Sequence, residues 1–229
     1  MLRTYFVDSG AGGCGVTFNS RCIVEMLLQQ KQNRIEKIYV VDVFALYTDL
    51  CNETYGLRDD IVDGVCVFAI NHRITCVDDW FSCVSLLDEL GAFDQTSNTR
   101  IVFSASRYAS MLFAENSMLV NLLQTLNVVH VWTLGTTEYS VSNLANKVRD
   151  YPLFYSNGIV VRNLKNGNAE DFIFWNGSEL EKKLRGYGWH VVDEPLVSGE
   201  NNTARLANRN LHDLFAIFEK TDFDGSNNA

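Results

Sequence analysis

The alternation of short apolar runs with segments of helical spacing is the feature that most constrains this fold. Five runs are rich in β-branched and aromatic residues, at 4–7, 37–44, 65–70, 100–105 and 128–134. Four segments between or after them repeat apolar residues with helical spacing, at 18–32, 77–90, 115–126 and 140–150. Nearly continuous apolar strands are typical of parallel sheets covered on both faces. The order predicts an α/β fold with a mostly parallel central sheet and helices on both faces, a Rossmann-like three-layer sandwich.

The last third of the chain is less regular. Residues 158–162 and 172–175 predict a hairpin around Asn166-Gly167. Two short helices are expected further on, at 178–185 and 211–220, before a polar tip that ends at Ala229. We therefore expect one domain over residues 1–180 and a C-terminal extension over 181–229, with a short helix and a disordered tip.

Charge and hydrophobicity argue against nucleic-acid binding and against a membrane-spanning helix. The 229 residues include 19 basic and 28 acidic side chains, for a net charge of −9. Nucleic-acid affinity depends mostly on basic side chains that displace counterions, so we expect no nucleic-acid partner. No apolar stretch reaches the roughly 18 residues that a membrane-spanning helix needs, so we expect no membrane span.

Six cysteines all fall within the first 83 residues. Their even number leaves disulfides and buried free thiols both open, and no pair has the C-x-x-C spacing of a zinc or redox site. Three glycosylation sequons, at Asn52, Asn176 and Asn201, are explained by the high asparagine content. Since the first residues lack the apolar core of a signal peptide, we expect an extracellular protein if a precursor segment is missing, and a cytoplasmic one otherwise.

Polar and glycine residues follow several of the predicted strands. Ligands bind at the carboxyl ends of strands in open α/β sheets, so these loops are the candidate partner- or ligand-binding sites. The candidate residues are Asp8, Ser9, Gly10, Gly12, Asn71, Thr75, Ser104 and Ser106. They belong to three loops, 8–15, 71–75 and 104–108.

The segment from Leu119 to Pro152 resembles part of a von Willebrand factor type A domain. It looks like that family's helix, short turn, and strand that ends in a Thr-Ile-Gly type sequence, here Thr133-Leu134-Gly135. Residues 100–107 and the run Phe6-Val7-Asp8-Ser9 look like two other strands of the family, and the resemblance covers residues 3–180. It implies a non-enzymatic protein-binding or adhesion-type module with a protein partner.

The resemblance also implies where a divalent cation would lie. In the family, an Asp-x-Ser-x-Ser motif, a threonine and a second aspartate hold the ion, and Mg²⁺ requires such oxygen ligands. Asp8 matches the first aspartate and Thr75 the threonine, but Gly10 and Gly12 replace the serines, and the last position falls near Ser106. We expect a degenerate site with Asp8 as its one weak candidate ligand, and therefore no bound cofactor, Mg²⁺ included.

Two enzymatic interpretations of the same loop compete with this one. The run from Asp8 to Gly13 is similar to the opening of glutamate and aspartate racemases, whose chemistry needs two opposed thiols; no cysteine follows Cys83. The loop also fits Gly-x-Gly-x-x-Gly, with Asp42 as the acidic residue that a dinucleotide fold requires. The alternative function is therefore a small-molecule or nucleotide-binding enzyme that uses the Gly10–Gly15 loop.

Overall fold

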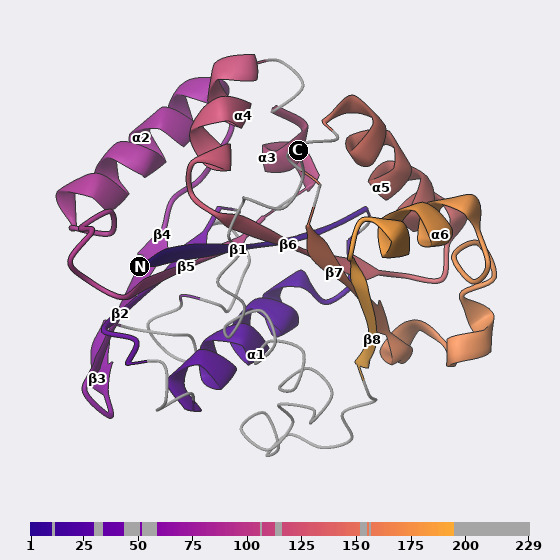
Figure 1. Ribbon diagram of the computed structural model, residues 1–229, viewed down its shortest axis with the longest axis horizontal. Helices are drawn as coiled ribbons and strands as arrows, with labels where there is room; N and C mark the ends of the chain where they lie inside the picture. The colour runs from indigo at the N-terminus through magenta and orange to yellow at the C-terminus, as the bar shows by residue number, and fades with distance from the viewer. Residues whose placement is uncertain are drawn as a thin grey trace.

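An eight-stranded sheet forms the centre of the computed structural model (Figure 1). The structure describes residues 1–10, 12–29, 34–43, 51, 59–105, 107–112, 116–151, 155 and 157–194. Its strands are β1 (Leu2–Ser9), β2 (Lys37–Asp42), β3 (Asp60–Val62), β4 (Val65–Asn71), β5 (Thr99–Ser104), β6 (Val128–Leu134), β7 (Gly158–Asn163) and β8 (His190–Glu194).

The strands lie in the order β3-β4-β2-β5-β1-β6-β7-β8. Every pair is parallel except the short hairpin of β3 with β4. β1 lies between β5 and β6, strands that come about 100 and 125 residues later in the chain. The mostly parallel sheet predicted from the sequence is confirmed.

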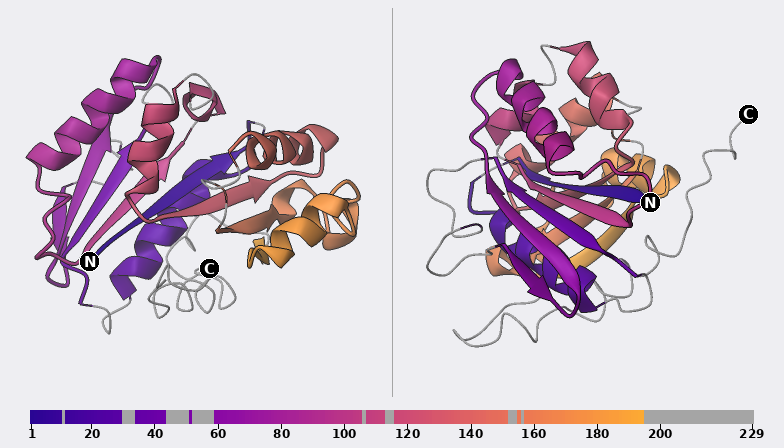
Figure 2. Two further views of the ribbon diagram at one scale, coloured as in Figure 1. Left: turned by 45° about the horizontal axis from the view of Figure 1, so that its top comes forward. Right: turned by 90° about the vertical axis from the view of Figure 1, so that its left-hand side faces the viewer.

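Helices cover the two faces of the sheet unequally (Figures 1 and 2). Helix α1 (Val16–Gln29) lies on one face. The other face carries α2 (Val77–Glu89), α3 (Arg107–Met111), α4 (Ser117–Gln124), α5 (Glu138–Asp150) and α6 (Glu179–Gly186). The arrangement confirms the three-layer α/β fold.

Alternate residues of each strand fill two separate cores, because successive side chains point to opposite faces of a sheet. In β1, Tyr5 and Val7 pack with the α1 core, whereas Phe6 packs with the core beneath the other five helices. Trp80 of α2 stacks on Phe6 with ring centroids 6.0 Å apart, and it contacts Phe103 edge-on. Both faces of β1 are therefore enclosed from Arg3 to Ser9.

The predicted hairpin around Asn166-Gly167 is wrong. Residues 158–163 form β7, which pairs in parallel with β6 and β8. Phe172 and Trp175 are buried, whereas Ile173 and Phe174 between them are exposed, and the Trp175 amide donates to the Phe172 carbonyl oxygen at 3.0 Å. The buried residues lie three apart, which is the spacing of a turn, whereas a strand alternates with a period of two.

The described fold continues past residue 180. Helix α6 confirms the short helix expected at 178–185, and β8 then joins the sheet beside β7. The helix expected at 211–220 and the polar tip lie outside the described residues. Within the described part of the chain, no helix has the length and apolar character required to cross a membrane.

All six cysteines are free thiols in the structure. Four are buried, Cys66 is half-buried and Cys76 is exposed. Burial, and next the neighbouring Asp42 carboxylate, raise the pKa of the Cys51 thiol to about 12. Burial alone raises the pKa of Cys83 to about 12. The sequence left disulfides and thiols both open, and the structure has thiols at all six positions.

The rate at which each thiol reacts with Ellman's reagent at pH 8 should follow its exposure to solvent. Only a thiolate attacks the reagent, so exposed Cys76 should react first and half-buried Cys66 more slowly, while the other four thiols react only after unfolding. Cys76→Ser should remove the fastest phase, and Cys83→Ser should leave it unchanged. A total below six in denaturant without reductant would contradict the free-thiol state.

Candidate functional site

Polar residues end neighbouring strands at the carboxyl edge of the sheet. Asn71 at the end of β4 is in register with Asp42 of β2, and Asp42 with Ser104 of β5. Ser104 is in turn in register with Val7, the residue before Asp8 in β1. The structure therefore brings the strand-end members of the three predicted loops to one edge, as the sequence predicted.

Asp8 forms a buried ion pair with Lys147 of helix α5. The Lys147 Nζ lies 2.7 Å from Asp8 Oδ2, and their side chains are 12% and 1% exposed. The ammonium group also contacts the Ser110 hydroxyl of α3 and lies 5.5 Å from the centre of the Trp132 ring. The Ser9 amide donates to the second Asp8 carboxylate oxygen at 2.7 Å. Both oxygens of the predicted cation ligand are thus engaged by the protein itself.

The sequence did not single out Lys147. It follows Leu144 by three residues and precedes Val148, and both of these are buried. A lysine inside the apolar stripe of an amphipathic helix is the signal that could have identified it, because a buried ammonium requires a counter-charge. Its partner could not be identified from spacing, since Asp8 lies 139 residues earlier.

The electrostatic effect of Asp8 extends to a nearby phenol. Tyr155 is almost fully buried, and its ring lies 4.1 Å from the His130 ring. Burial first, and the Asp8 carboxylate second, raise the pKa of Tyr155 well above its usual value. Tyr155 therefore stays a neutral packing residue across the physiological pH range.

Gly10 is required by close packing against α5. A Cβ at Gly10 would lie 2.8 Å from the Ser140 Cα and 2.9 Å from its carbonyl oxygen. The Asn143 side chain of the same helix donates to the Gly10 carbonyl oxygen at 3.2 Å. Since any side chain would displace the α5 backbone, only glycine fits here.

A residue of β7 holds the C-terminal end of the loop that follows β1. Asn163 donates to the Cys14 carbonyl oxygen at 2.7 Å, and its amide nitrogen fills the space that a Cβ on Gly15 would need. Gly15 also has φ +98°, which favours glycine. By contrast, Gly12 and Gly13 are exposed, and no described residue beyond their chain neighbours comes within 4 Å of where a Cβ would lie. Protein contacts thus explain two of the glycines, and the nucleotide-binding interpretation of the loop stays a prediction.

The second predicted loop forms the start of α2. Asp79 Oδ2 accepts hydrogen bonds from the Thr75 amide and hydroxyl, at 2.6 and 2.7 Å, and from the Cys76 amide. Asn71 donates to the Cys51 carbonyl oxygen at 2.7 Å. The Asp79 carboxylate thus caps the helix and engages the Thr75 hydroxyl, and strands β2 and β5 lie between β4, which precedes this loop, and β1, which carries Asp8.

Serines of the other loops have different surroundings. Ser9 and Ser104 are buried, and by strand alternation they face α1, on the opposite side of the sheet from the Asp8 carboxylate. Ser106 lies outside the described residues. Across the described parts of the chain, no group of three or more His, Cys, Asp or Glu side chains is arranged to hold a metal ion.

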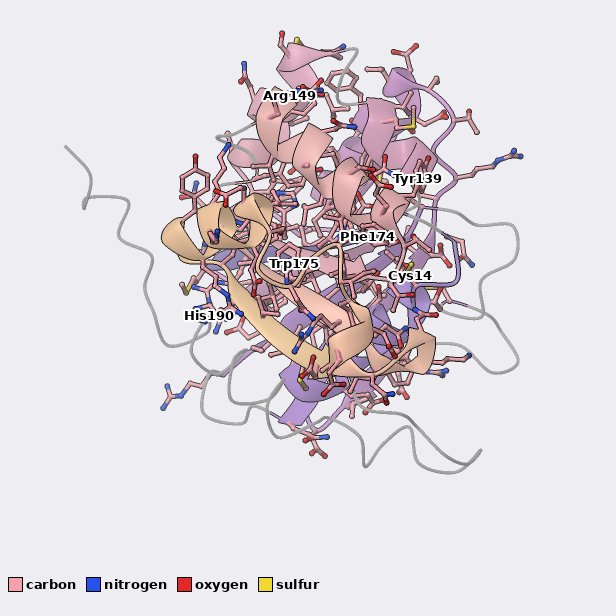
Figure 3. The ribbon with its side chains drawn as sticks, turned by 90° about the vertical axis from the view of Figure 1, so that its right-hand side faces the viewer. Cys14, Tyr139, Arg149, Phe174, Trp175 and His190 are labelled. Atoms are coloured by element: carbon pink, nitrogen blue, oxygen red, sulfur yellow. The ribbon has the colours of Figure 1, made fainter. Side chains whose placement is uncertain are left out.

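Exposed apolar side chains lie at the same edge. Tyr139, in the first turn of α5, is 43% exposed, and Ile173 and Phe174, after β7, are 69% and 43% exposed. We call these three residues the carboxyl-edge patch. Figure 3, which faces the carboxyl end of β1, shows Tyr139 and Phe174 on one face together with Cys14. A Cβ on Gly167 would lie 3.0 Å from the Thr136 side chain, so the loop after β7 passes beside the residues that precede α5.

Side-chain contacts hold Ile173 and Phe174 in place. Arg162 of β7 forms a two-point ion pair with Asp193 of β8, at 2.7 and 2.9 Å, and donates to Asn176 at 2.9 Å. The Asn176 side-chain amide donates to the Ala169 carbonyl oxygen at 2.8 Å. With Phe172 buried on one side and Trp175 on the other, the two exposed residues project from an anchored turn.

No family model matches the chain, and no curated protein matches it significantly.

Lys147→Met should lower the free energy of unfolding by about 3 to 5 kcal/mol, because it leaves the Asp8 carboxylate buried without a counter-charge. The Asp8→Asn/Lys147→Met double variant should recover part of this loss. Arg149→Met is the matched control, since the Arg149–Asp150 pair is exposed and contributes at most about 1 kcal/mol. Urea unfolding measures all three. Equal effects at 147 and 149 would contradict the role of the ion pair.

Asp79→Asn should lower stability at pH 7 by about 1 kcal/mol, the usual value of a helix cap. Hydrogen bonds from Thr75 hold the pKa of Asp79 down to about 2. A lowered folded pKa stabilises the fold above the unfolded value, and this contribution is lost as pH falls. The difference from the wild type should therefore shrink between pH 4 and 2. Asp78→Asn, in the same turn, is the control for the loss of one acidic charge from the start of α2.

Proposed function

We propose that this chain is a non-enzymatic protein-binding domain that contacts its partner through the carboxyl-edge patch without a bridging cation. The proposal retains the resemblance to a type A domain whose cation site is largely lost. The Asp8–Lys147 ion pair carries the claim of cation independence, and the carboxyl-edge patch carries the choice of a protein partner.

The ion pair supports cation independence through its charge and its geometry. A divalent cation at Asp8 would neutralise the carboxylate and offer open positions to a partner. Here the Lys147 ammonium supplies the positive charge from within the chain, 2.7 Å from the carboxylate. A cation that approached Asp8 would have to displace this ammonium and the Ser9 amide. The site therefore favours the protein's own lysine over a metal ion.

The carboxyl-edge patch supports a protein partner. Aromatic residues dominate the centres of protein interfaces, where they bury a large area at a small cost in side-chain entropy. Two of the three patch residues are aromatic, and the buried Phe172 and Trp175 anchor the turn that carries Phe174. A prearranged apolar surface loses little freedom on binding, which favours association.

Site-specific photo-crosslinking should test the location of the interface. Benzoylphenylalanine at position 173 should trap a partner in lysate of cells that natively express the chain, with equal yield in Mg²⁺ and in EDTA. Position 61 is the matched control, because Ile61 and Ile173 are both 69% exposed. Phe174→Ala should reduce the adduct at 173. Equal adducts at 61 and 173, or an adduct lost in EDTA, would contradict the proposal.

Titration with metal ions tests cation independence directly. Calorimetry with Mg²⁺, Mn²⁺ and Ca²⁺ should show no sub-millimolar binding, and such binding abolished by Asp8→Ala would overturn the claim of cation independence.

A thermal-shift screen with NAD(P), ATP and dicarboxylic amino acids tests the enzymatic alternative. A ligand at 100 times its Kd would add about 2.7 kcal/mol of stability, and a clear shift would favour that alternative.

A further inference from the structure

A pocket of about 550 Å³ opens at the other end of the sheet, where β1 begins. Its walls come from α2, from the turn after α2, and from α4 and the residues that follow it. Figure 2 shows α2 and α4 on the same face of the sheet, and the two helices are in contact. The volume falls within the range of about 300 to 1,000 Å³ that is usual for sites that bind small molecules.

The walls of the pocket combine apolar and acidic side chains. Six apolar side chains line it: Met1, Leu2, Val84, Phe93, Leu122 and Leu126. Asp88 and Asp94 supply two carboxylates, and no lysine or arginine is among the lining residues. Two positive groups lie at its margin: the amino group of the lining residue Met1, which donates to the Ser97 carbonyl oxygen at 2.7 Å, and Lys37, which acts electrostatically on Asp94. The chemistry of the walls favours a ligand with an apolar body and a cationic group.

The two carboxylates are not equivalent. Asp94 accepts hydrogen bonds from the Thr96 amide and hydroxyl, at 2.9 and 2.7 Å, so the surrounding turn already uses it. The Asp88 carboxylate has no hydrogen bond or ion pair with any described residue. Asp88 is therefore the acidic group that can accept a hydrogen bond from a ligand.

The position of Asp88 in α2 also favours a cation. The C-terminal end of a helix carries a partial negative charge, which makes basic residues favourable there and acidic ones unfavourable. Helices α5 and α6 follow this rule with two basic residues each in the last turn. Helix α2 has no basic residue in its last turn and ends with Asp88-Glu89. Lys37 reaches the Gly91 carbonyl oxygen beyond the helix end, at 3.4 Å, but it does not line the pocket.

We propose that this pocket binds a small organic amine, with its apolar body between Val84, Phe93 and Leu122 and its ammonium group at Asp88. The carboxylate and the negative end of α2 act together on the same cation. The proposal does not depend on the proposed function, since the carboxyl-edge patch lies at the opposite end of β1.

Three probes of similar shape and different charge test the proposal on the full chain: octylamine, 1-octanol and octanoate. Calorimetric titration should give an affinity for octylamine about tenfold above that for 1-octanol, with octanoate weakest. Amide signals of the pocket residues in NMR spectra should shift with octylamine. Similar affinities for the three probes, or shifts confined to other surfaces, would overturn the proposal.

Asp88→Asn should abolish the preference for octylamine over 1-octanol while 1-octanol still binds. Glu89→Gln is the matched control, because it removes the same charge from the same helix end at a residue that does not line the pocket. It should leave the preference unchanged. Loss of the preference in both variants would show a general charge effect and overturn the assignment of Asp88. Circular dichroism and thermal unfolding establish that each variant is folded.

Discussion

The buried pair of Asp8 and Lys147 ties the central strand of the sheet to helix α5. A carboxylate with 1% exposure at the end of β1 requires a counter-charge, and Lys147 of α5 supplies it. That requirement fixes where α5 docks, and the loop after β1 must then pass directly beside the first turns of the helix. Gly10 meets this restriction because it has no side chain, and Asn143 of α5 holds its carbonyl oxygen. The same helix places Tyr139 at the carboxyl edge, so the ion pair also positions part of the proposed interface.

The two sides of the carboxyl edge differ in their chemistry. The side covered by α5 holds a full charge pair, whereas the strand ends that face α1 carry uncharged hydrogen-bonding groups and Asp42. Two of those groups satisfy the loop after β1: Thr133 donates to the Asp8 carbonyl oxygen at 3.1 Å, and Asn163 donates to that of Cys14. Buried carbonyl groups need such partners. The polar residues at these strand ends therefore close the fold, which is a structural role that the sequence pattern alone could not separate from ligand binding.

Sequence reasoning predicted the interior strands and missed those at the edges. An interior strand is covered on both faces, so the runs at 37–44 and 128–134 stand out as continuous apolar segments. β3 has only three residues, all exposed, and β8 contains His190, Asp193 and Glu194, so neither has that pattern. The run at 172–175 has strand composition, but tertiary packing selects a turn that buries Phe172 and Trp175. Strand order was not predictable either, because it depends on pairings between β1 and strands far along the chain.

In the candidate site, too, features set by neighbouring residues in the sequence were predictable, whereas contacts between distant segments were not. Asp8, Asn71 and Ser104 could be placed at one edge because strand ends are local features of the sequence. Thr75 was assigned as a candidate ligand from its position, and the spacing did not reveal that its hydroxyl donates to Asp79, a residue four positions later. Lys147 was missed because its role exists only when β1 and α5 are packed together. The eight residues of β1 span about 26 Å at 3.3 Å per residue, and groups separated by more than about 10 Å usually contribute independently. The carboxyl-edge patch and the amine pocket, at opposite ends of β1, are therefore energetically separate features.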